Sequence, residues 1–184
     1  MPERPATDGL PLAIVVMGVA GCGKTLLGQA LAERLGWRFV EGDALHPAEN
    51  VAHMAAGLPL TDELRIHWLD AVGLAIADTA NDGVSAIAAC SALKRTYRDQ
   101  LRGWHPNLTF VHLVIDKQTA RDRVASRVGH FMPASLVDSQ FATLEPPEAD
   151  ENALRLDGTL PLSVLVEKAT AATEPASGRR VAGR

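Results

Sequence analysis

A glycine-rich stretch near the start of the chain, GVAGCGKT at positions 18–25, has the residue types and spacing of a phosphate-binding loop. It matches the pattern G-x-x-x-x-G-K-[ST], which ends here in Lys24 and Thr25. Glycines let successive backbone N–H groups point into one concavity, and the following helix adds partial positive charge at its N-terminus. Lys24 would reach the β- and γ-phosphates, and the Thr25 hydroxyl would bind Mg²⁺. The sequence therefore predicts a site for a nucleoside triphosphate and Mg²⁺, made by Gly18, Val19, Ala20, Gly21, Cys22, Gly23, Lys24, Thr25 and Leu26.

The loop does not identify the reaction, because GTPases, motor ATPases and small-molecule kinases share it. The chain has no Asn-Lys-x-Asp motif for guanine and no Leu-Ser-Gly-Gly-Gln transporter signature. Asp116 ends the apolar run FVHLVID, where it can order Mg²⁺ in an ATPase or cap the helix that follows. The cap is the favoured interpretation.

A second cluster follows the run WRFVEGD, which ends in the carboxylate of Asp43. Ligands of parallel sheets bind beyond the carboxyl ends of the strands, so Asp43 is predicted to lie near the phosphates. There it can accept the proton of an attacking hydroxyl and orient that group toward the γ-phosphate. The alternative is a turn residue that caps the next segment. His46 is a candidate substrate contact or a packed histidine, and Glu41 can assist Mg²⁺ through water or be solvated.

Basic residues gather in the stretch CSALKRTYRDQLR. Lys94, Arg98 and Arg102 are spaced by four residues and therefore share one face of a helix. That helix is expected to begin at the same end of the sheet as the phosphate loop, where it would suit an anionic acceptor. Lys94 is of the right type to contact that acceptor, and the guanidinium of Arg98 or Arg65 can bind a carboxylate at two points. The alternative is a solvated basic stripe.

The stretch ARDRVASRVGHFMP places Arg123 and Arg127 on one helix face, followed by a glycine and His130. Two helices joined by a glycine break are typical of a lid, predicted at about 121–142, that excludes water from the phosphates. The two arginines would neutralise charge on the transferred phosphoryl group, and His130 would contact the substrate. The alternative is an ordinary helical pair with a basic surface.

These clusters need a scaffold that brings them to one edge of a sheet. Apolar runs alternate with segments of helical periodicity, which predicts an α/β fold of three layers, a parallel sheet with helices on both faces. Strands are predicted at 12–17, 37–43, 84–90, 108–115 and 153–157, and helices at 24–35, 47–56, 61–80, 93–104, 117–128, 135–144 and 161–172.

Length and composition limit the class of protein further. A chain of 184 residues suggests one domain, predicted at 11–173 between a flexible arm at 1–10 and a disordered tail at 174–184. A net charge of −4 without a basic run argues against nucleic-acid partners. The apolar run at 10–17 is too short to span a membrane and lacks a positive head like that of a signal peptide. Two cysteines are too few for a disulfide framework, which favours the cytoplasm.

Several stretches together resemble the thermoresistant gluconokinase family of P-loop carbohydrate kinases. They are MGVAGCGKT, EGDALHP, CSALKRTYRDQLR, GHFM and LVDSQFATLEPPEADE, and the resemblance covers about residues 12–172. It implies a five-stranded parallel sheet of order 2-3-1-4-5 and a homodimer. It also implies transfer of the ATP γ-phosphoryl group to the 6-hydroxyl of D-gluconate, whose product feeds the pentose phosphate or Entner–Doudoroff route. A hydroxy acid of this kind needs side chains such as Asp43, His46, Arg65, Lys94 and Arg98.

Two other functions stay open. One is a kinase of another small anionic acceptor, such as shikimate or a nucleoside monophosphate. The other is a P-loop ATPase that works through a partner surface and turns over ATP without a sugar acid.

Cys22 stands in the phosphate loop where related sequences often carry serine. A thiol among N–H donors at a helix N-terminus is expected to have a lowered pKa. The sequence therefore predicts a modest sensitivity to thiol reagents, with protection by ATP.

Overall fold

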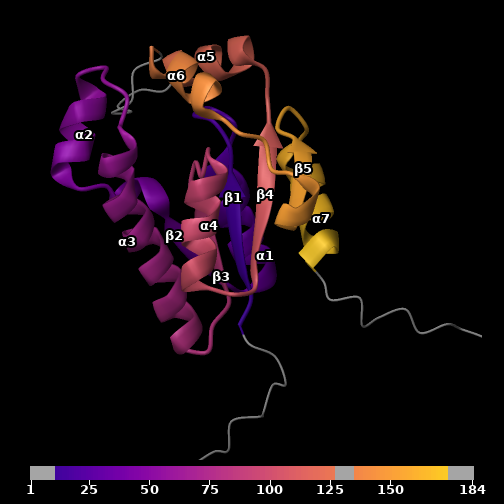
Figure 1. The fold of residues 1–184 in the computed structure, drawn as a ribbon. Coiled ribbons are helices and arrows are strands. Elements are labelled where there is room, and N and C mark those ends of the chain that lie inside the picture. The colour runs from indigo at the N-terminus through magenta and orange to yellow at the C-terminus, as the bar shows by residue number, and fades with distance from the viewer. Residues whose placement is uncertain (1–10, 127–134, 174–184) are drawn as a thin grey trace, which may run out of the picture.

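The computed structural model describes residues 11–126 and 135–173, whose strands form one parallel sheet (Figure 1). The strand order is β2-β3-β1-β4-β5, which confirms the predicted order. Parallel strands in this order place all their carboxyl ends at one edge of the sheet. The strands are β1 (Ala13–Met17), β2 (Arg38–Glu41), β3 (Ala86–Ala89), β4 (Leu108–Val114) and β5 (Ala153–Asp157).

Seven α-helices are present in the described part of the chain, all within predicted segments or extending them by one residue. Two short 3₁₀ helices, η1 (Gly42–Leu45) and η2 (Ala149–Glu151), were not predicted. The α-helices are α1 (Lys24–Leu35), α2 (Ala48–Ala55), α3 (Asp62–Asn81), α4 (Arg95–Trp104), α5 (Lys117–Ala125), α6 (Leu136–Thr143) and α7 (Leu162–Thr173).

The core lies on both faces of the sheet, as the alternating apolar runs predict. Along β1, Ala13, Val15 and Met17 face a cluster with α3 and α4, whereas Ile14 and Val16 face α1 and α7. Successive strand residues point to opposite faces, so an all-apolar strand such as β1 is buried on both. Helices therefore cover both faces of the sheet below its carboxyl edge.

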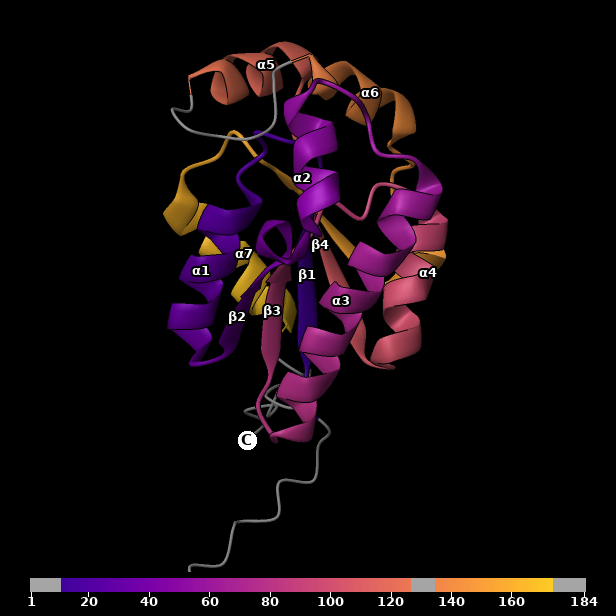
Figure 2. The ribbon, with the colours of Figure 1, turned by 90° about the vertical axis from the view of Figure 1, so that its left-hand side faces the viewer.

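Helices α5 and α6 lie above that edge, where Figure 2 shows them crossing over the ends of the strands. They contain described residues of the segment predicted as a lid, whose closing over the phosphates stays a prediction. The Asp116 carboxylate accepts from the backbone N–H of Thr119 at 2.8 Å and caps α5, so the cap interpretation is confirmed. Arg127 and His130, like the predicted arm at 1–10 and tail at 174–184, lie outside the described residues.

No helix in the described ranges is long and apolar enough to cross a membrane.

Candidate active site

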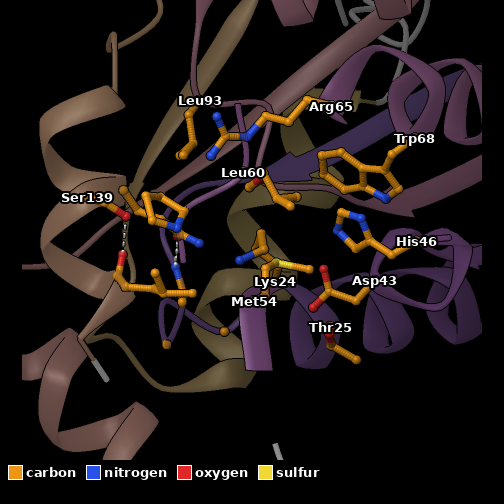
Figure 3. A pocket seen from close by; sticks show the side chains of 17 residues that line it. Lys24, Thr25, Asp43, His46, Met54, Leu60, Arg65, Trp68, Leu93 and Ser139 are labelled. Carbon is orange, nitrogen blue, oxygen red and sulfur yellow. Dashed lines mark hydrogen bonds between the residues drawn. The ribbon is translucent and has the colours of Figure 1, made fainter. Parts of the chain in front are cut away.

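One pocket opens at the carboxyl edge of the sheet, between the phosphate loop, η1, α3 and α6 (Figure 3). The loop between β1 and α1 forms its floor, Asp43 follows β2, and Ser91 follows β3. Three neighbouring strands therefore deliver polar groups to one place. The predicted site residues that line it are Ala20, Gly21, Gly23, Lys24, Thr25, Asp43, His46 and Arg65.

The phosphate loop owes its shape to glycine. Gly18 has φ +138°, and a Cβ atom there would lie 2.6 Å from the carbonyl oxygen of Leu113. Gly23 has φ +101° and precedes the first turn of α1. Both backbone conformations are disfavoured for other residues, so these two positions require glycine. The side chain of Leu26 is 60% exposed and does not line the pocket.

The Lys24 ammonium and the Thr25 hydroxyl stand at the mouth of the loop. Lys24 Nζ donates to the carbonyl of Val19 at 3.0 Å, and Thr25 Oγ1 donates to Oε2 of Glu41 at 2.7 Å. A hydroxyl backed by a carboxylate suits Mg²⁺, which prefers oxygen ligands and few protein contacts when it binds with a triphosphate. Thr25 and Glu41 therefore fit the predicted metal.

The Asp43 carboxylate lies in the pocket beside Lys24 and Thr25, at the end of the phosphate loop, and beside His46 (Figure 3). Its backbone N–H donates to Oε1 of Glu41 at 3.3 Å, which fixes the turn of η1. A carboxylate in this position faces both the phosphate loop and the open part of the pocket. It is placed to accept a proton from a bound hydroxyl.

Trp68 is a pocket residue that the sequence analysis missed. Its ring stacks on His46 with centroids 4.1 Å apart and an interplanar angle of 13°. Its indole N–H donates to the carbonyl of Gly42 at 2.7 Å, which ties α3 to η1. Burial lowers the pKa of His46 to about 4, so the imidazole is neutral at physiological pH. Trp68 follows Arg65 by three residues on one helix, a spacing that places both on the same face.

Gln140 was also missed, although it lies in the family-like stretch SQFATLE. Its Oε1 accepts from the backbone N–H of Ala20 at 2.7 Å, across 120 residues of chain. Helix α6 thus contacts the phosphate loop directly and brings Ser139 to the pocket wall. This contact was not predictable from local spacing, because it joins two distant segments.

Arg65 is the arginine that the structure places in the pocket. Its side chain is 12% exposed, and Nη1 donates to the Tyr97 hydroxyl at 3.3 Å. Lys94 does not line the pocket, because its ammonium binds Asp62 at 2.8 and 2.9 Å. Tyr97 also donates to Asp62, so this carboxylate organises the basic side chains near the pocket.

Arg98 was predicted as a carboxylate ligand, and the structure contradicts this. Its side chain is fully buried, and it forms a two-point ion pair with Glu151 at 2.6 and 2.8 Å. Nη1 donates to the carbonyls of Ala92, Leu93 and Glu145. These bonds occupy the guanidinium and join α4 to the segment between α6 and β5. Arg98 therefore shapes the scaffold and is not available to a ligand.

Arg123 lies on the other side of the phosphate loop from Asp43. Its Nη1 donates to the carbonyls of Gly21 and Gly158, at 3.3 and 3.1 Å. It lines a second hollow with Leu26, between α1, α5 and the turn after β5. The structure thus brings Arg123 to the loop but separates it from the acceptor side of the pocket.

The expected reactivity of Cys22 is wrong. The side chain is 1% exposed, and burial raises the pKa of its thiol, against the smaller opposing effect of Lys24. Cys90 is fully buried, and its pKa rises to about 12.

We therefore expect both thiols of the native protein to react with Ellman's reagent far more slowly than those of the unfolded chain, with no loss of activity. Fast modification of Cys22 that ATP prevents would show that the loop opens.

Comparisons with known proteins show which family the chain resembles. A family model described as an AAA domain matches residues 14–147. The chain is 47% identical to a gluconokinase from Gluconobacter oxydans (strain 621H) over 169 residues, which cover 91% of this chain and 95% of that protein. It is 40% identical to a thermoresistant gluconokinase from Escherichia coli (strain K12) over 153 residues, which cover 83% and 87%. A solved gluconokinase from Sinorhizobium meliloti 1021 superposes with a TM-score of 0.78 at 44% identity, with coverage of 89% and 91%.

The fold, the phosphate loop and the relatives all indicate the same family. The sheet order matches that implied by the resemblance, and the relatives align over nearly the whole chain. The pocket brings a phosphate loop and a carboxylate together at the edge of that sheet. The chain belongs to the gluconokinase family of P-loop kinases.

Proposed function

We propose that this protein transfers the γ-phosphoryl group of Mg·ATP to the 6-hydroxyl of D-gluconate. The observation that carries the proposal is one pocket lined by Lys24, Asp43 and Arg65. These side chains supply a cation for phosphate, a carboxylate for the attacking hydroxyl and a guanidinium for the acceptor's carboxylate. No single one of them would distinguish a kinase from an ATPase.

On the nucleotide side, the loop's backbone N–H groups and the N-terminus of α1 bind phosphate. Lys24 exchanges its contact with Val19 for the β- and γ-phosphates. Thr25, backed by Glu41, would hold Mg²⁺, which would supply positive charge to the phosphate oxygens. Arg123, and in our proposal Arg127, add positive charge near the nucleotide, while α5 and α6 exclude water.

On the acceptor side, Arg65 binds the gluconate carboxylate and His46 contacts the sugar-acid chain. Asp43 accepts the proton of the 6-hydroxyl and orients that oxygen toward the γ-phosphate. The distribution of charge supports this orientation, because Arg65 lies on α3 and Lys24 lies across the pocket on α1. His130 remains a predicted substrate contact, and Lys94 acts only through Asp62.

The decisive test is a coupled assay of ADP release from Mg·ATP, with D-gluconate, shikimate or AMP as acceptor, or with none. We expect release to depend on D-gluconate alone, because only this acceptor has both a carboxylate and a reactive hydroxyl at the far end of a hydroxylated chain. A Lys24→Met variant controls for contaminating kinases. Dependence on shikimate or AMP would support the other kinases, and release that ignores every acceptor would identify an ATPase.

The homodimer, the cytoplasmic location and the place in the pentose phosphate pathway complete the proposal. The homodimer and the pathway are what the family resemblance implies, and the location is inferred from the two cysteines. Sedimentation of the full chain tests the first of these.

A further inference from the structure

The His46 ring is held by contacts that the proposed reaction does not explain. Trp68 stacks on one face of the ring at 4.1 Å. Nδ2 of Asn50 lies 3.4 Å from its Nδ1. Asn50 is 1% exposed, on the inner side of α2, one turn after His46.

The orientation of the Asn50 amide follows from its second contact. Nδ2 also donates to the backbone carbonyl of Leu64 at 2.9 Å. A carbonyl oxygen can only accept, so the amide nitrogen, and not the amide oxygen, must face Leu64. The same nitrogen then offers its other hydrogen to Nδ1 of His46. Nδ1 must therefore carry a lone pair, which leaves the proton of the neutral ring on Nε2.

The surroundings keep the ring neutral. Burial outweighs the opposing effect of Asp43 and lowers the pKa of His46, while the positive charge of Arg65 lowers it further. Among the described residues, Lys24 is the other cation that lines the pocket. On α2, Glu49 is exposed, and Nε2 of His53 lies 3.2 Å from the carbonyl of Pro59. Asp43 is the acidic group whose charge acts on the ring, and burial outweighs it.

We infer that Asn50 is a positioning residue that fixes His46 as an Nε2–H hydrogen-bond donor to the acceptor's reactive hydroxyl. This inference rests on the proposed function. A hydroxyl that donates its proton to Asp43 can still accept one hydrogen bond, and His46 lies beside Asp43 in the pocket (Figure 3). The hydroxyl oxygen has two lone pairs and one hydrogen. One lone pair accepts a hydrogen bond from His46, the hydrogen is donated to Asp43, and the second lone pair is free to attack the phosphoryl group.

The first test reads the tautomer directly and needs no turnover. Long-range ¹H–¹⁵N NMR of the full chain at pH 7, without ligands, distinguishes Nε2–H, Nδ1–H and the imidazolium. The chain has six histidines, and the signals absent from a His46→Gln variant assign this ring. We expect Nε2–H. Either other form would overturn the inference, whatever acceptor the enzyme uses.

The second test changes the partner of Nδ1. In Asn50→Asp, the new carboxylate attracts a proton to Nδ1 and raises the pKa of His46. Above that pKa, the ring keeps Nδ1–H and loses the donor at Nε2. We therefore expect kcat/KM for D-gluconate in the variant to fall about tenfold as the pH rises from 6 to 9, the order of one lost hydrogen bond. The wild-type profile should lack this fall.

The matched control is Asn81→Asp, which makes the same chemical change at the exposed end of α3. It should keep the wild-type pH profile and the wild-type His46 signals. An Asn50→Asp profile parallel to that of the wild type would contradict the inference. If Asn50→Asp does not fold, the tautomer of His46 in the wild-type protein still tests the inference. A failure of D-gluconate as acceptor would instead appear in the ADP assay and leave the NMR result unchanged.

Discussion

Replacing Asp43 by asparagine should lower kcat by about 10²–10⁴-fold, the range of a lost general base. Asparagine keeps the size and the polar character of the side chain but cannot take the proton of the hydroxyl. Because the phosphate loop is untouched, the KM for ATP should change little. Steady-state kinetics with each substrate varied in turn would separate the two effects.

The control for this prediction is Asp78→Asn, which removes a carboxylate from an exposed position of α3. It should have wild-type kinetics. Normal turnover by the Asp43 variant would remove this carboxylate from the mechanism. A large rise in the KM for ATP with unchanged kcat would show instead that Asp43 serves the nucleotide or its metal.

Replacing Arg98 by methionine should lower the free energy of unfolding by about 3–5 kcal/mol, because it removes the two-point partner of the buried Glu151 carboxylate. The two side chains are 0% and 1% exposed, so water cannot replace the lost partner. Arg102, 3.1 Å from the same carboxylate, compensates only in part. Urea unfolding at pH 7 measures the loss.

The same pair predicts a pH dependence. Arg98, by its hydrogen bonds, lowers the pKa of Glu151 from 4.5 to about 2 in the folded protein. The stabilisation is present above pH 4.5 and is lost as the pH falls toward 2, because the unfolded chain takes up the proton first. Glu151→Gln should have a smaller loss of stability over this range than the wild type.

A matched control is Arg38→Met, which breaks an exposed pair with Asp82 at 2.8 Å. The side chains of Arg38 and Asp82 are 48% and 61% exposed, so the free energy of unfolding of this variant should fall by no more than about 1 kcal/mol. If Arg98→Met unfolds like the wild type but has a raised KM for D-gluconate, Arg98 binds the substrate and our structural assignment is wrong.

Much of the fold was predictable from the sequence. Strands such as β1 are apolar at every position, which is typical of a parallel sheet buried on both faces. The helix at 24–35 was predicted with its observed bounds because a glycine stands at either end. The strand order came from the family resemblance, since local patterns do not say which strands are neighbours.

The candidate site was predictable where the chemistry is local to one segment. The phosphate loop, Asp43 and His46 each follow a strand, and the strand ends bring them together. Arg98 was misjudged because spacing shows which residues share a helix face but not what that face meets. Its partner, Glu151, lies 53 residues further along the chain. Gln140 and Trp68 were missed for the same reason, because their contacts join segments that meet only in the folded protein.

The stack of Trp68 on His46 has a practical consequence for optical work. The chain has three tryptophans, all in the described ranges, and of these Trp68 lines the acceptor side of the pocket. Trp37 packs against the core near β2, and Trp104 is 38% exposed on α4. Indole emission changes with the polarity and the protonation of neighbouring groups. The protein therefore carries its own fluorophore beside the histidine that we propose contacts the acceptor. With Trp37 and Trp104 replaced by phenylalanine, binding of a sugar acid should change the emission of Trp68 and so be measurable without a label or a coupled enzyme.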